Sequence, residues 1–201
     1  MLIYRNNSDT LIIVVHEIYG LNDHIKGVCQ SLSDSGYDID CPDLLDGRPP
    51  FDYSQEEEAY RYFLNFVDFE PSEKKITFLL RQEEKEYKQI FLLGYSAGAT
   101  IAWLCSGLNV KCDGVIGFYG SRVRDYMETT PKCPVLLIYP EEEKSFDPYV
   151  LREGLSKKEK VEVHILDGKH GFADPYNINY NEISTLEANR IAKDFLAKWR
   201  Y

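Results

Sequence analysis

The sequence predicts an α/β fold with a mostly parallel sheet and helices on both faces. The first reason is that short apolar runs alternate with longer amphipathic segments throughout the 201 residues. The second is that several runs, such as Leu11–Val15, are apolar without alternation, which is typical of strands covered on both faces. The third is that no repeat, low-complexity segment or Gly/Ser linker interrupts the chain, so we expect a single domain over residues 1–201.

Six apolar, β-rich runs predict the strands. In chain order they are Leu11–Val15, Tyr37–Cys41, Ile90–Leu93, Gly114–Tyr119, Pro134–Tyr139 and Val161–Ile165. Because a parallel sheet binds its ligands beyond the carboxyl ends of the strands, we expect functional side chains directly after these runs.

The segments between the runs have helical patterns. Asn22 or Asp23 caps a first helix that ends at Gly36, and a second pattern covers residues 55–68. Pro71 suits the first turn of a third helix. The remaining predicted helices are a buried one, Ala97–Leu108, and a C-terminal one whose apolar stripe runs from Ala188 to Trp199.

Charge and cysteine content narrow the function classes. The chain has 23 basic and 33 acidic residues, a formal net charge of −10, which disfavours binding to nucleic acid. No basic amphipathic stretch indicates a membrane surface, and the N-terminus lacks a signal-peptide pattern. The five cysteines include no C-x-x-C pair, so we expect free thiols, no metal site and a cytoplasmic location.

Ser96 is the candidate nucleophile, because Gly94-Tyr95-Ser96-Ala97-Gly98 follows the G-x-S-x-G pattern between a predicted strand and a predicted helix. This is the context of a nucleophile elbow, where small neighbours let a sharp turn pack closely. The helix N-terminus then offers N–H groups to an oxyanion. The alternative interpretation is a purely structural turn. A lone serine hydroxyl is a weak nucleophile, so the choice depends on whether the chain also supplies a base and an acid.

His170 is the candidate general base. In this kind of fold the acid and the histidine follow the serine in chain order, which excludes His16. His170 follows the run Val161–Ile165, where the base belongs, whereas His164 lies inside that run as a strand residue. His24 lies in the first turn of a helix, and the sequence identifies no partner for it.

The acid is expected in the loop after Pro134–Tyr139, which reads Pro140-Glu141-Glu142-Glu143-Lys144-Ser145-Phe146-Asp147-Pro148. Four carboxylates compete there, and composition does not choose among them. Asp167 is a further candidate, but it lies only three residues before His170 and is expected to be a turn residue.

The loop after Leu11–Val15 reads His16-Glu17-Ile18-Tyr19-Gly20. A backbone N–H from this loop is the usual second oxyanion donor, so we expect Ile18 to act beside Ala97. Glu17 has two interpretations, a functional carboxylate or a hydrogen-bonded turn residue.

Four segments together resemble the dienelactone hydrolase family of α/β-hydrolases. They are His16–Gly20, Gly36-Tyr37 through Cys41-Pro42-Asp43-Leu44, Gly94–Gly98 and His170-Gly171-Phe172. The resemblance runs from about residue 10 to the C-terminus and implies an α/β-hydrolase fold. The founding enzymes use a cysteine nucleophile, so Ser96 at that position points to serine-esterase chemistry. The family acid falls on Glu143 when counted from Pro134 without a gap, and a short insertion would move it to Asp147.

One further position matches those founding enzymes, and another differs from them. The family glutamate matches Glu17, and in the cysteine enzymes it interacts with the resting thiol. An arginine that holds the substrate carboxylate lies just past the family's H-x-F segment, where this chain has Phe172-Ala173-Asp174. Because Asp174 would repel a carboxylate, dienelactone itself is not the expected substrate.

We therefore expect a hydrolase of a small ester, thioester or lactone that needs no cofactor. Ser96 forms the acyl-enzyme, His170 is the base, and Glu143 orients it. The residues expected to line the acyl pocket or support the site are Glu17, Tyr19, Tyr95, Tyr119 and aromatic side chains between residues 51 and 66. Two alternatives stay open: a lactone-specific hydrolase, and a non-catalytic ligand-binding protein if no carboxylate reaches His170. The sequence does not predict the oligomeric state.

Overall fold

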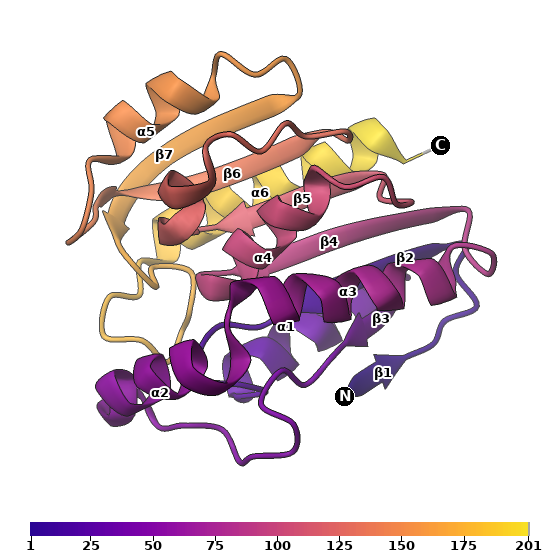
Figure 1. Cartoon of the computed structure of the whole chain (residues 1–201), viewed down its shortest axis with the longest axis horizontal. Coiled ribbons are helices and arrows are strands. Elements are labelled where there is room, and N and C mark those ends of the chain that lie inside the picture. Colours follow the sequence, from indigo (N-terminus) through magenta and orange to yellow (C-terminus); the bar gives the residue numbers. More distant parts are fainter. Residues whose placement is uncertain (201) are drawn as a thin grey trace.

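A seven-stranded sheet lies between two layers of helices in the computed structural model, which describes residues 1–200 (Figure 1). The strand order is β1-β3-β2-β4-β5-β6-β7, and only the pairing of β1 with β3 is antiparallel. The strands are β1 (Leu2–Tyr4), β2 (Thr10–Val15), β3 (Asp38–Cys41), β4 (Gln89–Tyr95), β5 (Gly114–Phe118), β6 (Val135–Glu142) and β7 (Val161–Lys169). The predicted mostly parallel sheet is confirmed.

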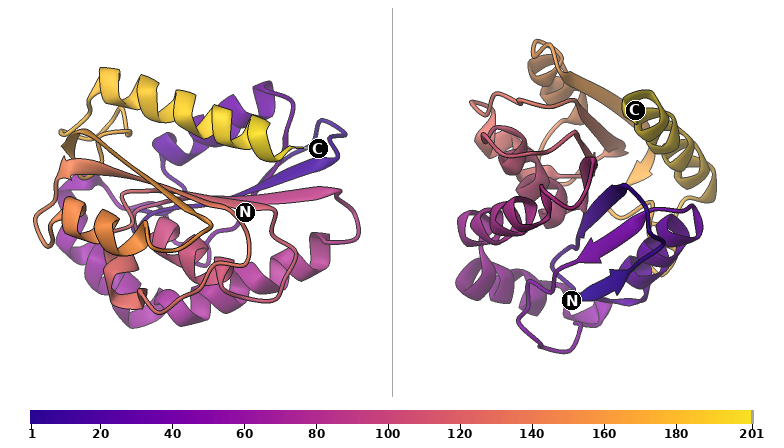
Figure 2. Two further views of the ribbon diagram at one scale, coloured as in Figure 1. Left: turned by 90° about the horizontal axis from the view of Figure 1, so that it is seen from above. Right: turned by 90° about the vertical axis from the view of Figure 1, so that its right-hand side faces the viewer.

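Helices cover both faces of this sheet (Figure 2). One face carries α1 (Asp23–Asp34) and α6 (Glu182–Trp199), and the other carries α3 (Phe69–Glu83), α4 (Ala97–Ser106) and α5 (Pro148–Leu155). The short helix α2 (Glu56–Tyr62) follows a 3₁₀ turn, Tyr53–Gln55, and continues into a π-helical turn, Phe63–Val67. Within residues 1–200, no helix has both the length and the apolar character that crossing a bilayer requires.

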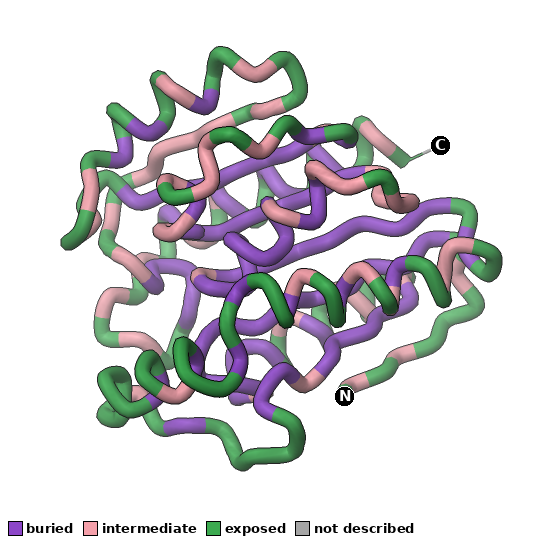
Figure 3. The backbone as a smooth tube through the Cα atoms, in the orientation of Figure 1, coloured by how far each residue is buried: buried purple, intermediate pink, exposed green. Residues whose placement is uncertain are grey.

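The sheet divides the apolar core into two clusters. In β2, Leu11, Ile13 and Val15 belong to the cluster beneath α3 and α4, whereas Ile12 and Val14 belong to the cluster beneath α1 and α6. Successive side chains of a strand point to opposite faces, so a strand buried on both faces carries an unbroken apolar run. Figure 3 shows the buried strands at the centre, with exposed positions along the outer helices.

The predicted ends of α1 are confirmed. The Asn22 side chain accepts a hydrogen bond from the Ile25 N–H at 3.0 Å, which caps the helix. The chain leaves the helix through Gly36, whose φ of +88° lies in the left-handed region that favours glycine. This cap matters for the site because it anchors the loop between β2 and α1.

One strand and one α-helix of the structure were not predicted from the sequence. Strand β1 has only three residues and pairs at the sheet edge, so it carries little hydrophobic pattern. Helix α5 begins at Pro148, and its N-cap is Asp147, whose carboxylate accepts hydrogen bonds from the Tyr149 and Val150 N–H groups. The eight-residue helix is too short for a clear apolar period to stand out.

Strands β6 and β7 extend beyond their predicted ends. Glu142 pairs with Lys169 across the two strands, with 3.3 Å between Oε2 and Nζ. These charged residues have no apolar signal, so the sequence analysis placed them in loops. Asp167, expected in a turn, lies within β7 instead, where it accepts a hydrogen bond from the Asn181 side chain at 3.0 Å.

Candidate active site

Ser96 lies in a strained turn between β4 and α4. Its φ and ψ are +51° and −114°, a backbone conformation that residues other than glycine rarely adopt. A Cβ at Gly94 would clash with the backbone of Gly98, and a Cβ at Gly98 would clash with the carbonyl of Val15. The two glycines therefore let the turn pack against itself and against the end of β2.

The structure brings Ser96, His170 and Glu143 together. The Oγ of Ser96 lies 2.9 Å from Nε2 of His170, and Nδ1 of His170 lies 2.8 Å from Oε1 of Glu143. The His170 side chain is 36% exposed, whereas the Glu143 side chain is only 4% exposed. A buried carboxylate thus faces one ring nitrogen, and a hydroxyl faces the other.

The ends of β6 and β7 explain this meeting. Glu143 is the first residue after β6, and His170 is the first residue after β7. Since the two strands are parallel neighbours, their carboxyl ends deliver both side chains to one place. Asp147, the other acid that the sequence allowed at this position, caps α5 instead. Glu143 is therefore the one of the two that contacts His170.

Two further residues hold His170. The side-chain amide of Asn179 donates to the His170 carbonyl at 2.9 Å. The ring of Tyr119 packs against the imidazole, with 4.9 Å between ring centroids. Tyr119 is fully buried and has a φ of +41°, so a second strained residue directly follows β5 beside the strained Ser96 turn.

The predicted oxyanion donors are Ile18 and Ala97. Ala97 is the first residue of α4, directly after Ser96, and Ile18 lies in the loop after β2, which neighbours β4. Neither backbone N–H donates to another backbone group in the turns, loops and caps of residues 1–200. As the first residue of α4, Ala97 lies at the positive end of that helix.

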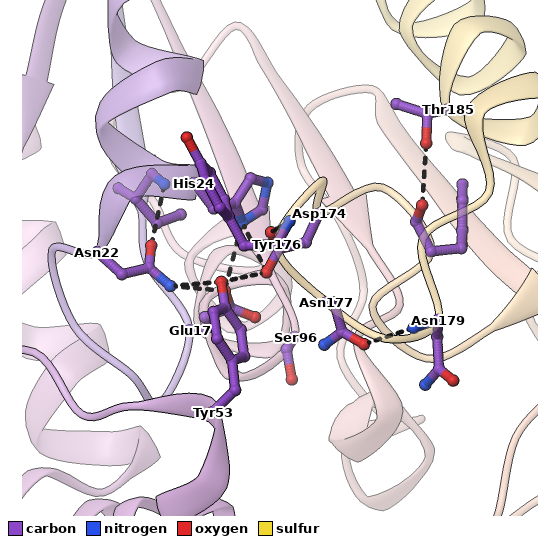
Figure 4. A network of polar contacts seen from close by, with 12 residues as sticks. Glu17, Asn22, His24, Tyr53, Ser96, Asp174, Tyr176, Asn177, Asn179 and Thr185 are labelled. Atoms are coloured by element: carbon purple, nitrogen blue, oxygen red, sulfur yellow. Dashed lines mark hydrogen bonds and ion pairs between the residues drawn. The ribbon is translucent and has the colours of Figure 1, made fainter.

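A buried polar cluster lies beside Ser96 (Figure 4). Nδ1 of His24 is 3.3 Å from Oε1 of Glu17 and 3.7 Å from Oδ2 of Asp174. All three side chains are at most 5% exposed, and burial raises the pKa of the Asp174 carboxyl. The sequence identified no partner for His24, and the structure corrects this with two.

Hydrogen bonds tie this cluster to the surrounding loops. The Tyr53 hydroxyl donates to Asp174 at 2.5 Å, and the Asn22 side chain lies 3.5 Å from Glu17. Burial raises the pKa of the Tyr53 hydroxyl, which keeps it protonated as a donor. Glu17, His24 and Asp174 each offer one possible metal-ligand atom, and these atoms lie within 4.8 Å of one another, close enough to hold a metal ion. His24 contacts both carboxylates, and the Tyr53 and Asn22 side chains donate to their oxygens.

His16 has a structural part in the same loop. Its Nε2 accepts a hydrogen bond from the Leu44 N–H at 2.9 Å, while Nδ1 donates to the Glu17 carbonyl at 2.6 Å. Burial lowers the pKa of this imidazole, in agreement with a neutral ring that both accepts and donates. The loops after β2 and β3 are therefore joined through His16.

The three tyrosines expected to line the acyl pocket or support the site are all buried. Tyr95 is 4% exposed and stacks on Phe118, with its edge toward His24, so it supports the site from within the core. Tyr119 is fully buried, and Tyr19, at 7% exposure, packs against the ring of Tyr53.

Sequence reasoning missed the parts played by His24, Tyr53 and Asn179. Asp174 was singled out only for its charge, although its position four residues after His170 is a signal that it shares the same loop. No local pattern marks Tyr53 or Asn179, because each reaches a partner through the tertiary fold.

Known proteins resemble this chain over nearly all its length. A sequence profile described as the dienelactone hydrolase family matches residues 2–199. YczH, an uncharacterized protein of Bacillus subtilis strain 168, is 36% identical over 92% of this chain and 91% of its own length. Carboxymethylenebutenolidase of Pseudomonas putida is 28% identical over 93% of this chain and 85% of its own length.

Solved structures share the fold. A dienelactone hydrolase-like promiscuous phosphotriesterase, P91, from metagenomic libraries has a TM-score of 0.75 and 14% identity, covering 94% of this chain and 86% of that one. A cold-adapted esterase from an Arctic intertidal metagenomic library has a TM-score of 0.73 and 17% identity, covering 96% of this chain and 83% of that one. Both have the α/β-hydrolase fold.

Proposed function

Because the chain belongs to the dienelactone hydrolase family, we propose that it hydrolyses a carboxylic ester, thioester or lactone through an acyl-enzyme on Ser96. The observation that supports this mechanism is the continuous contact from hydroxyl to imidazole to carboxylate. It runs over 2.9 Å from Ser96 to His170 and 2.8 Å from His170 to Glu143. These are hydrogen-bond distances without any movement of the side chains.

In the acylation step, His170 takes the proton of Ser96 as the hydroxyl oxygen attacks the acyl carbonyl. Glu143 keeps the His170 proton on Nδ1, which leaves the Nε2 lone pair facing Ser96, and it stabilises the imidazolium that forms. The N–H groups of Ile18 and Ala97 receive the developing oxyanion, at about 3 kcal/mol per donor.

Deacylation uses the same groups. After His170 has given its proton to the leaving alcohol, thiol or ring oxygen, it takes a proton from the water molecule that attacks the acyl carbonyl. His170 then returns this proton to the Ser96 oxygen as the bond between that oxygen and the acyl group breaks, which releases the acid. The strained turn at Ser96 keeps its Oγ beside both the imidazole and the N-terminus of α4, so neither step requires the serine to be repositioned.

A lactone-specific hydrolase is the second candidate function. The observation that favours it is the name of the Pseudomonas putida relative, carboxymethylenebutenolidase, which acts on a lactone ring. The other alternative, a non-catalytic ligand-binding protein, was considered for the case in which every acid in the loop after β6 points away from His170. Glu143 lies 2.8 Å from His170, so that condition is not met.

The test is active-site labelling with a fluorophosphonate probe, followed by mass spectrometry to locate the label. We expect labelling at Ser96 that is lost in Ser96→Ala while the variant keeps the thermal unfolding temperature of the wild type. A folded wild-type protein that stays unlabelled, or a Ser96→Ala variant with full turnover, would refute the proposal. Rates with p-nitrophenyl acetate, an acyl thioester and a γ-lactone then distinguish the substrate classes.

A further inference from the structure

A pocket of about 330 Å³ lies next to the polar cluster of Glu17, His24 and Asp174. We infer that it binds a substituted ammonium group. Tyr53 and Tyr176, which lie 123 residues apart in the sequence, both line the pocket. Neither residue belongs to the serine, histidine and glutamate arrangement, so this is a second binding feature beside the proposed reaction centre (Figure 4).

The first argument is the charge beneath the pocket. Three of its lining residues hydrogen-bond to buried carboxylates. The Tyr53 hydroxyl donates to Oδ2 of Asp174 at 2.5 Å, and the Tyr176 N–H donates to Oδ1 of Asp174 at 2.9 Å. The Asn22 side chain lies 3.5 Å from Oε1 of Glu17. Two carboxylates therefore lie one hydrogen bond behind the pocket wall, where poor screening extends their field into the pocket.

The second argument is the charge at the pocket surface. Asp23 and Asp52 line it directly, and Lys26 is the cation among the lining residues. The Lys26 ammonium is bound to Asp23, with 3.0 Å between Nζ and Oδ1. Together with the buried cluster, four carboxylates thus lie at or behind the pocket, against the Lys26 ammonium and the His24 imidazole. The nearby Arg48 guanidinium is paired with Glu58 at 3.0 Å, so an excess of negative charge is left for a ligand to balance.

The third argument is the aromatic surface. The face of an aromatic ring attracts a cation, and two tyrosines, Tyr53 and Tyr176, line the pocket. Phe51 lies at the same pocket, and the Arg48 guanidinium already rests 4.1 Å from its ring centroid. One aromatic ring of the pocket, that of Phe51, thus binds a cation of this chain. A substituted ammonium suits rings better than a primary amine does, because it carries fewer N–H groups that need acceptors.

Two sources could supply such a group: a free ammonium compound, or the ammonium part of an ester substrate. Only the second rests on the proposed function. Tyr176 is 59% exposed, so the pocket is open to solvent and either source can reach it.

The binding test uses tetramethylammonium chloride, with sodium chloride at equal concentration as the salt control. Calorimetric titrations compare choline with its neutral isostere 3,3-dimethylbutanol. We expect choline to bind at least about tenfold more tightly than the neutral alcohol. Equal affinity of the two compounds, or no heat with tetramethylammonium, would overturn the inference.

A matched pair of variants locates the site. Tyr176→Leu removes one ring and should weaken tetramethylammonium binding about 2- to 30-fold, the range of a cation–π contact. Tyr180→Leu changes a 41% exposed tyrosine of the same loop that does not line the pocket, and it should bind as the wild type does. Both variants are checked for unchanged thermal unfolding. If Tyr176→Leu binds tetramethylammonium as tightly as Tyr180→Leu, the cation lies elsewhere and the inference fails.

Kinetics distinguish the two sources of the ligand. If the ammonium group is part of the substrate, kcat/KM for acetylcholine exceeds that for 3,3-dimethylbutyl acetate, and tetramethylammonium competes with both esters. If the ligand is a free ammonium compound, the two esters have equal kcat/KM although tetramethylammonium binds. Calorimetry needs no turnover, so it remains decisive even if Ser96 proves unreactive toward the fluorophosphonate probe.

Discussion

Replacing Glu143 with glutamine should lower kcat about 10⁴-fold while the fold stays intact. Glutamine keeps the size of the side chain but loses its charge, and its amide can present a donor to His170. The imidazole then takes the tautomer whose proton faces Ser96, which prevents it from accepting the serine proton.

The geometry sets the size of this effect. Two unit charges 2.8 Å apart interact by about 6 kcal/mol at an effective dielectric constant of about 20. A loss of 10⁴ in rate corresponds to about 5.5 kcal/mol of transition-state stabilisation. The carboxylate is 4% exposed, so water screens the interaction little and most of it is available to the imidazolium.

Asp147→Asn is the matched control in the same loop. Asp147 caps α5 through the N–H groups of Tyr149 and Val150, and asparagine caps helices about as well, so both kcat and stability should stay close to wild type. The assay is steady-state hydrolysis of p-nitrophenyl acetate, with thermal unfolding of each variant. The reasoning is refuted if Glu143→Gln keeps kcat within tenfold of wild type, or if Asp147→Asn loses as much.

Three further predictions concern the turn and the buried groups. Gly98→Ala should lower the unfolding free energy by about 1–3 kcal/mol, because its Cβ would clash with the Val15 carbonyl; an unchanged denaturant midpoint contradicts this. Because burial lowers the pKa of His16, the unfolding free energy should fall as the pH drops below 6.5, by up to about 1.4 kcal/mol per pH unit. The His16→Gln variant should lack this contribution to the slope. Because burial raises the pKa of Asp174, the opposite trend is expected for this carboxyl: stability is lost as the pH rises above 3.8 toward the raised pKa. Denaturant unfolding measured at a series of pH values should show that Asp174→Asn removes this loss.

The sequence alone predicted those parts of the site that follow local rules. The G-x-S-x-G pattern identified Ser96, because only glycine fits a turn that approaches the end of β2 so closely. Chain order after the last predicted strand identified His170. The sheet and the ends of α1 were predictable because unbroken apolar runs, an asparagine cap and a terminal glycine are short-range signals.

The tertiary structure decided which acid meets the histidine. Glu143 and Asp147 are four residues apart in one acidic loop, and composition treats them alike. Strand β6 continues to Glu142 beside β7, which brings Glu143 next to His170, while α5 engages Asp147 at its N-terminus. The pairing of charged strand ends has no apolar signature, so it could not be predicted from hydrophobic periodicity.

The buried cluster has the same origin. Glu17, His24 and Asp174 come from segments separated by up to 157 residues, and the hydroxyl of Tyr53 arrives from a third loop. Sequence determined that these carboxyl, imidazole and hydroxyl groups exist near strand and helix ends. The folded sheet brings the carboxyl ends of its parallel strands together, and this decides that the four side chains are buried side by side next to Ser96. The sequence could not show this, because contacts between distant segments follow from packing rather than from local spacing.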